Sequence, residues 1–307
     1  MTAPPFFIVG FQRSGTTLLR LMLDNHPDIA IPLDTVGLWA RYEDHVADYG
    51  GLATDADAGR MVRDILADER IRLWQVPLDA DRILALRRYP GLPGIMDAFH
   101  LAYAEARGKR RWGDKDPGNM HRIDRLHRWF PTCRIVHIIR DGRDACLSHR
   151  GQSFGVQDLT ECADLWREQV EWVRRMGVLL GEARYHELRY EDLVARPEEV
   201  LRGVAAFLEL PWAPEMLTYH ERVDRSVPEE KRHLWPLLNQ RPGADKAGRW
   251  REGMTTGERI CFERRAGRLL ATLGYDTLPR PLPRAPFTEL RLLGRRFWRA
   301  LRARAGA

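Results

Sequence analysis

The sequence predicts an α/β fold in which helices flank a central parallel sheet, with a helical insertion after the first structural unit. Apolar side chains run without interruption over residues 6–9, and they dominate residues 135–139, as in strands that are buried on both faces. A turn and a helix follow each run directly, as in proteins built from parallel strands. We find no internal repeat and no low-complexity linker, so residues 1–286 are predicted to form one domain.

The first unit reads FFIVGFQRSGTTLLRLMLD and begins at Phe6. After the strand, Leu18, Leu21 and Met22 recur at the spacing of a helix. The turn between strand and helix keeps the two glycines of a loop that binds nucleoside triphosphates, but Thr16 stands where that loop has its lysine. The fold is therefore predicted to be P-loop-like.

The turn has the chemistry of an anion site. A cation, hydroxyl groups and the backbone amides of a helix start are gathered in five consecutive residues: Arg13, Ser14, Gly15, Thr16 and Thr17. This set suits an anion that carries several oxygens. The alternative is a glycine-rich turn that serves only tight packing between strand and helix.

Residues 35–110 are mostly helical in character and are interrupted by a Pro/Gly cluster at 90–94, which predicts the helical insertion. Beyond it, a helix that ends at Pro131 leads into the second strand. Arg140 follows this strand directly, and the next helix carries Ser148. Because ligands of parallel sheets lie beyond the carboxyl ends of the strands, Arg140 is expected in the same crevice as the first turn. The alternative for this segment is an Arg/Asp turn on the surface.

Composition limits the class of protein. The chain has 307 residues with a formal net charge of +6 and an isoelectric point near 9.3, which favours anionic partners. Its four cysteines lack metal-ligand spacing, so we expect reduced thiols and no structural metal. The N-terminal apolar run is too short for a signal peptide, and about eighteen consecutive apolar residues occur nowhere, so we expect a cytoplasmic protein.

The motifs GFQRSGTT and RIVHIIRDGRDACLS resemble the two nucleotide-binding motifs of sulfotransferases, which use 3′-phosphoadenosine 5′-phosphosulfate (PAPS). Three further segments match the family in order: DKDP, ELRYEDLVARPEEVLRGVAAFLEL and DKAGRWREGMT. The resemblance covers nearly the whole chain and is closest to the tyrosylprotein sulfotransferases and their bacterial relatives. That branch has arginine at the position of Arg13, where the small-molecule branch has lysine. Its glutamate base corresponds to Asp34, which keeps the carboxylate but has one methylene less.

The resemblance implies roles for individual residues. The first turn holds the 5′-phosphosulfate, whereas Arg140 and Ser148 hold the 3′-phosphate. Arg13 and Lys115 stabilise the sulfuryl group in a loose, in-line transition state that is mainly a matter of charge and position. Asp34 takes the acceptor proton. Lys115 has an alternative as part of a salt-bridged turn, and Asp34 has one as a helix N-cap.

Further donor contacts follow from the same resemblance. Tyr190, at the end of a third strand expected at 188–190, contacts the adenine side, with a sheet-edge aromatic as the alternative. Lys246 and Arg249 match a segment that closes over the nucleotide and excludes water. The acceptor is a hydroxyl of a peptide tyrosine, a sugar, a lipid or a small metabolite.

Two other classes of protein stay open. A nucleoside or small-molecule kinase shares the loop but needs a lysine near Thr16 and carboxylates for magnesium, and neither is evident. A polyanion binder without catalysis would explain the charge, but the basic residues form no recognisable nucleic-acid module, so no nucleic-acid partner is expected.

Residues 287–307 are predicted to form a basic amphipathic helix. Leu290, Leu293, Phe297 and Leu301 share one stripe, and arginines lie largely off it. Such a helix suits peripheral contact with an anionic membrane, and its alternative is packing on the domain or on a partner subunit.

Overall fold

The computed structural model describes residues 3–33, 35–150, 155–221, 223, 227, 229, 243 and 247–282. In these ranges five parallel strands form one sheet in the order β2-β3-β1-β4-β5. The strands are β1 (Phe6–Val9), β2 (Ile29–Ala30), β3 (Arg111–Asp114), β4 (Arg134–Ile139) and β5 (Tyr185–Arg189). The fold class predicted from the sequence is confirmed.

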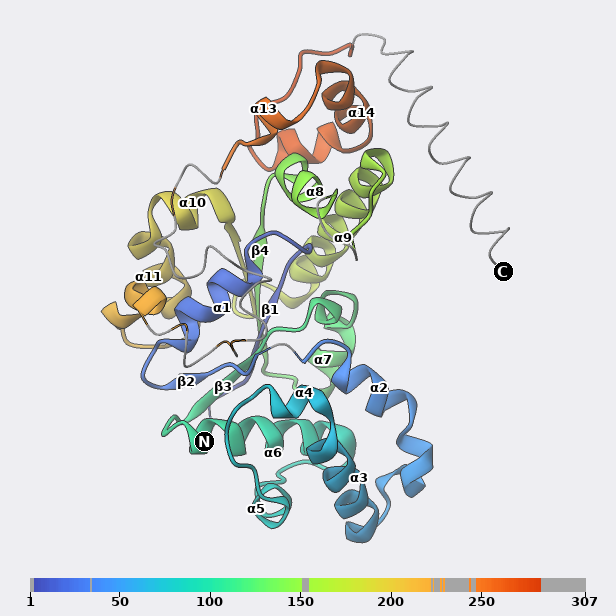
Figure 1. Ribbon diagram of the computed structural model, residues 1–307, viewed down its shortest axis with the longest axis vertical. Helices are drawn as coiled ribbons and strands as arrows, with labels where there is room; N and C mark the ends of the chain where they lie inside the picture. The colour runs from blue at the N-terminus through green and yellow to red at the C-terminus, as the bar shows by residue number, and fades with distance from the viewer. Residues whose placement is uncertain are drawn as a thin grey trace.

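Helices cover both faces of the sheet (Figure 1). Up to the end of β4 they are α1 (Thr16–Asp24), α2 (Leu38–Asp44), η1 (Val46–Leu52), α3 (Asp55–Ala67), α4 (Glu69–Arg72), α5 (Ala80–Ala85), α6 (Gly91–Ala106), η2 (Pro117–His121) and α7 (Ile123–Trp129). After β4 come α8 (Gly142–Arg150), α9 (Leu159–Leu180), α10 (Tyr190–Ala195), α11 (Pro197–Phe207), η3 (Pro214–Glu221), α13 (Trp250–Gly253) and α14 (Thr256–Thr272).

Strand β1 lies in the middle of the sheet, which explains why its sequence has no polar residue. Phe7 and Val9 pack into one core with α6, α7 and the helical insertion, whereas Phe6 and Ile8 pack into a second core with α1, α10 and α11. All four side chains are at most 1% exposed. Alternate side chains thus enter opposite layers, and on both faces they are buried.

The helical segment that was expected after the first unit lies between β2 and β3 and contains α2 to α6 with η1. Figure 1 shows it at one end of the molecule, with α13 and α14 at the opposite end. A third core, formed by α8, α9 and α14, fastens these C-terminal helices to the sheet through Ile139 of β4.

Two strand expectations need correction. Strand β3 was not predicted, because RWGD has one large apolar side chain, Trp112, and no apolar run. Gly113 of β3 lies directly beneath the ring of Phe6, where a Cβ atom would sit 2.4 Å from a ring carbon, so packing and not apolar content decides this strand. The last strand was expected at 188–190, but β5 is Tyr185–Arg189 and Tyr190 begins helix α10.

The expectation of four reduced cysteines is also wrong. Cys146 of α8 and Cys162 of α9 form a disulfide, with their Cα atoms 5.8 Å apart. Cys133 and Cys261 are free and buried. Sequence spacing did not indicate the pair because it arises from the packing of α8 against α9, which is a tertiary contact.

Candidate active site

The first turn passes very close to other backbone and ring atoms. A Cβ atom on Gly10 would lie 2.5 Å from the carbonyl oxygen of Ile138 in β4, and one on Gly15 would lie 2.5 Å from the ring of Tyr190. Gly15 also has φ +91° and precedes the first residue of α1, Thr16. Both glycines are therefore required for the turn to lie against β4 and α10, with the start of α1 directed at the turn.

The two segments that were predicted to bind phosphate lie side by side. The Arg13 Nε donates a hydrogen bond to Ser148 Oγ at 3.0 Å, and Arg140 Nη1 donates to the Arg13 carbonyl oxygen at 3.0 Å. The Arg140 guanidinium also stacks on the ring of Tyr190, 4.6 Å from its centroid. Four candidate residues from three segments of the chain thus meet beyond the carboxyl ends of β1, β4 and β5.

The site is electropositive. Burial, and next the neighbouring Arg140 guanidinium, lower the pKa of Arg13, and the residue is still cationic at neutral pH. Two guanidinium groups held this close favour an anion between or beside them. Ser14 is fully buried in the same turn.

Acidic residues around Arg140 are buried and organised, so the alternative of a surface Arg/Asp turn does not describe this segment. Asp144 is 2% exposed, and its Oδ2 lies 3.8 Å from Arg140 Nη2. Its carboxylate accepts the backbone N–H groups of Gly248 and Trp250, each at 2.7 Å. Burial raises the pKa of Asp144, whereas Arg140 and these two amides act in the opposite direction.

The segment before α13 therefore lies against α8, close to Arg140. Arg249 lies in it with an exposed side chain, between the two residues whose amides bind Asp144. Trp250 is 3% exposed and stacks on the guanidinium of Arg143 at 3.6 Å, which makes it a packing residue.

Lys115 follows β3 at the same edge of the sheet and is 3% exposed. Its two neighbours in sequence, Asp114 and Asp116, are fixed by hydrogen bonds. Asp114 accepts from Thr35 Oγ1 at 3.0 Å and from Asn119 Nδ2 at 2.7 Å. The Lys115 backbone is thus held between two anchored residues.

Asp116 connects the end of β3 to the insertion. Its Oδ2 accepts the Gly37 N–H at 2.8 Å, and its Oδ1 accepts the Gly118 N–H at 2.7 Å. Burial, and then the nearby Asp114, raise the pKa of Asp116 to about 6, so the group is a carboxylate at pH 7. Sequence reasoning missed this role and that of Asp144, although both acids stand inside the motifs that it singled out.

Some predicted elements lie outside the described residues: Asp34, Lys246 and the C-terminal helix at 287–307. In the part of the chain that is described, no group of three or more His, Cys, Asp or Glu side chains is placed to hold a metal ion. None of the helices described there combines the length and apolar character that a membrane span requires.

The chain belongs to the sulfotransferase family, whose sequence profile matches residues 4–214. Protein-tyrosine sulfotransferase A of Caenorhabditis elegans is 23% identical over 239 residues, which are 74% of this chain and 55% of that protein. The chain thus spans about half the length of this relative.

Solved sulfotransferases share the fold. The sulfotransferase domain of the olefin synthase from Synechococcus PCC 7002 superposes with a TM-score of 0.63 at 21% identity, over 91% of this chain and 98% of that domain. A mouse sulfotransferase in complex with PAP superposes with a TM-score of 0.50 at 12% identity, over 87% of this chain and 85% of that one.

Proposed function

We propose that this protein transfers a sulfuryl group from PAPS to an acceptor hydroxyl. The observation that carries the proposal is the convergence of Arg13, Arg140 and Ser148 beside a helix start that has no P-loop lysine. The two neighbouring cations come from different segments, Arg13 from the first turn and Arg140 from the end of β4, and such a pair suits a nucleotide that carries more than one phosphate group. Membership of the sulfotransferase family supports the same donor.

In this proposal the first turn binds the 5′-phosphosulfate through backbone amides and the hydroxyls of Thr16 and Thr17, together with Ser14 and Gly15. Arg140 and Ser148 bind the 3′-phosphate. Tyr190 supports Arg140 by stacking on it and borders the adenine side. Lys246 and Arg249 belong to the segment that covers the donor and excludes water.

The transfer itself is in line. The acceptor oxygen forms a bond to sulfur while the bond from sulfur to the phosphate oxygen of the donor breaks, and 3′-phosphoadenosine 5′-phosphate (PAP) leaves. Arg13 and Lys115 stabilise the charge on the transferred group and on the leaving oxygen. Asp34 receives the proton of the acceptor hydroxyl.

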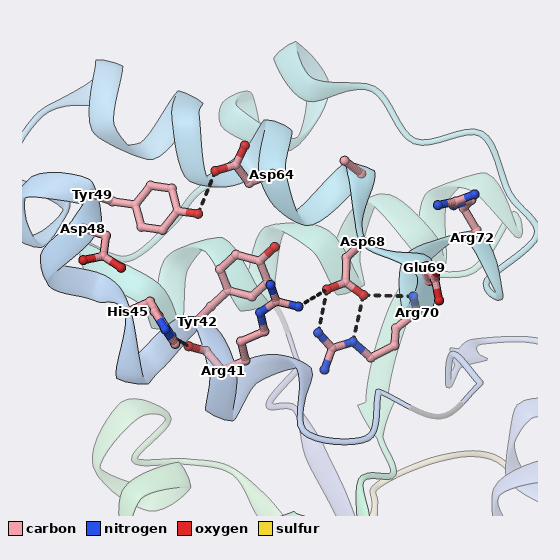
Figure 2. Close-up of a pocket in the computed structure, with 11 residues that line it drawn as sticks. Arg41, Tyr42, His45, Asp48, Tyr49, Asp64, Asp68, Glu69, Arg70 and Arg72 are labelled. Atoms are coloured by element: carbon pink, nitrogen blue, oxygen red, sulfur yellow. Dashed lines mark hydrogen bonds and ion pairs between the residues drawn. The ribbon is translucent and has the colours of Figure 1, made fainter.

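The acceptor site is proposed to be a groove of about 900 Å³ in the helical insertion (Figure 2). Figure 2 shows Arg41 and Arg70 converging on Asp68, with Arg70 Nη2 2.5 Å from Asp68 Oδ2, and the Tyr49 hydroxyl donating to Asp64 Oδ2 at 2.7 Å. Charged and aromatic side chains thus dominate the lining, which favours a polar hydroxylated acceptor over an apolar lipid.

A short path of hydrogen bonds joins this groove to Asp116, the residue after Lys115. Arg70 Nη1 donates to the carbonyl oxygen of Val36 at 3.2 Å, and the next residue, Gly37, donates its N–H to Asp116. The residues that follow Asp34 in the sequence are therefore held between the groove and the end of β3.

The first test is a thermal shift titration of wild type and Arg140→Ala with PAP, ATP and adenosine 5′-phosphate. A ligand at a hundred times its Kd stabilises the folded state by about 2.7 kcal/mol, so PAP is expected to give a large shift in wild type and a small one in the variant. A shift of equal size with ATP would contradict the proposal and favour a kinase.

Replacement of Asp34 by alanine is expected to lower kcat at saturating PAPS by about 10²- to 10⁴-fold, because general base catalysis contributes that much. PAP release in the presence of each acceptor class measures the effect, and Asp34→Glu, which restores the longer side chain of the tyrosylprotein branch, should keep most of the activity. Turnover of Asp34→Ala within a few-fold of wild type would remove Asp34 from this role.

A further inference from the structure

Asp144 is placed between the two parts of the donor site that lie far apart in the sequence. Arg140 comes from the end of β4, and the segment with Arg249 comes from the chain just before α13. One carboxylate touches both: Oδ1 accepts the Trp250 N–H, and Oδ2 accepts the Gly248 N–H and faces Arg140.

The free-energy cost of burying the Asp144 carboxylate indicates that this side chain has a specific structural or functional role. Asp144 has no exposed side-chain surface, and a buried carboxylate is retained at low cost only when its oxygens are paired. Here the pairing is made with two backbone amides of one segment and with Arg140, the arginine that is proposed to bind the 3′-phosphate. A carboxylate that served only to cap a helix would not need the arginine.

We infer that Asp144 is a positioning residue that makes the donor site selective for nucleotides with a 3′-phosphate. It orients the Arg140 guanidinium and fixes residues 247–250 beside it, so that recognition of the 3′-phosphate depends on one side chain. This inference rests on the proposed function and adds the residue that determines donor selectivity.

A purely electrostatic effect of Asp144 and a positioning effect predict opposite changes in the affinity for PAP, which makes the inference testable. A negative charge 3.8 Å from Arg140 weakens the attraction of that arginine for a phosphate, so its removal should tighten the binding of PAP if position is unimportant. If Asp144 acts by positioning, its removal leaves Arg140 and the segment at 247–250 without their shared partner, and the binding of PAP weakens.

The experiment compares dissociation constants of PAP and adenosine 5′-phosphate, which lacks the 3′-phosphate, for wild type, Asp144→Asn and Asp144→Ala by calorimetric titration. Wild type should prefer PAP. In Asp144→Ala the preference is expected to fall about tenfold or more, because hydrogen bonds to a charged group contribute at that level. Asp144→Asn keeps one acceptor oxygen and should show an intermediate loss.

Asp158→Asn is the matched control. Asp158 is also a buried carboxylate that accepts two backbone N–H groups, from Thr160 and Glu161, but these amides belong to the start of α9, which Asp158 caps. Its replacement should lower stability and leave the ratio of the two dissociation constants unchanged.

The outcomes separate the two proposals. A wild type without preference for PAP over adenosine 5′-phosphate would contradict the proposed function itself. A wild type that prefers PAP, with Asp144 variants that keep or increase that preference, would overturn only the role of Asp144. An equal loss of both affinities in the variants would mean that Asp144 is merely structural, and this result would overturn the inference as well.

Discussion

Replacement of Lys115 by methionine is expected to lower kcat by about 10²- to 10³-fold, while PAP binds with nearly unchanged affinity. The reason is the position of this lysine. It is buried at the carboxyl end of β3, between two aspartates that are anchored by hydrogen bonds, so its charge acts where little water competes. Methionine fills a similar volume without the charge. The measurement is PAP release at saturating PAPS, together with calorimetric titration of PAP.

Two further variants test whether the loss of rate is specific to the charge of Lys115 at this position. Lys115→Arg keeps the charge in a different shape and should recover part of the rate. Lys109→Met removes another largely buried lysine near the opposite end of β3, where Nζ donates to the Ile29 carbonyl oxygen at 2.7 Å. It should lower stability and leave kcat within about threefold of wild type, because it removes no transition-state contact. A Lys115→Met protein with a rate within tenfold of wild type would show that Lys115 is only part of a salt-bridged turn.

The largest expected effect on stability comes from Arg143→Met. This guanidinium is fully buried, donates to both oxygens of Asp141 at 3.0 and 2.7 Å and to Glu263 Oε1 at 2.9 Å, and stacks on Trp250. It therefore joins the turn after β4 to α13 and α14. Its loss leaves two buried carboxylates with fewer partners, and the free energy of unfolding should fall by about 3–5 kcal/mol.

Urea unfolding followed by circular dichroism measures this change. Arg128→Met is the control, because Arg128 forms an exposed pair with Asp124 at 3.5 Å within one helix, and such pairs contribute about 0.3–0.5 kcal/mol. Unfolding of Arg143→Met within about 1 kcal/mol of wild type would mean that the buried pairs contribute little net energy, as happens when desolvation offsets the attraction.

Much of the fold was predictable because its signals are local. The apolar runs of β1 and β4 and the helical spacing of Leu18, Leu21 and Met22 each reflect one element and the layers on its two sides. Strand β3 was not predictable, since its pairing depends on contact between Gly113 and Phe6, which are more than a hundred residues apart in sequence. The disulfide of Cys146 and Cys162 was missed for the same reason.

The candidate site also has one part that the sequence predicts and another that it does not. The sequence itself determined which residue types stand at the ends of the strands: the glycine-rich turn without a lysine, Arg13, Lys115 and Arg140. Parallel strands then bring their carboxyl ends to one edge, so a common location for these residues followed from the fold class.

Only the tertiary structure decided how these residues are held. The bond from Arg13 to Ser148, the stacking of Arg140 on Tyr190, and the buried carboxylates of Asp116 and Asp144 all join segments that are distant in sequence. The sequence does not distinguish an aspartate in solvent from one that is buried between two backbone amides. Because burial and the partners of a side chain are properties of packed elements, no local pattern specifies them, and the positioning of the site becomes visible only in the folded chain.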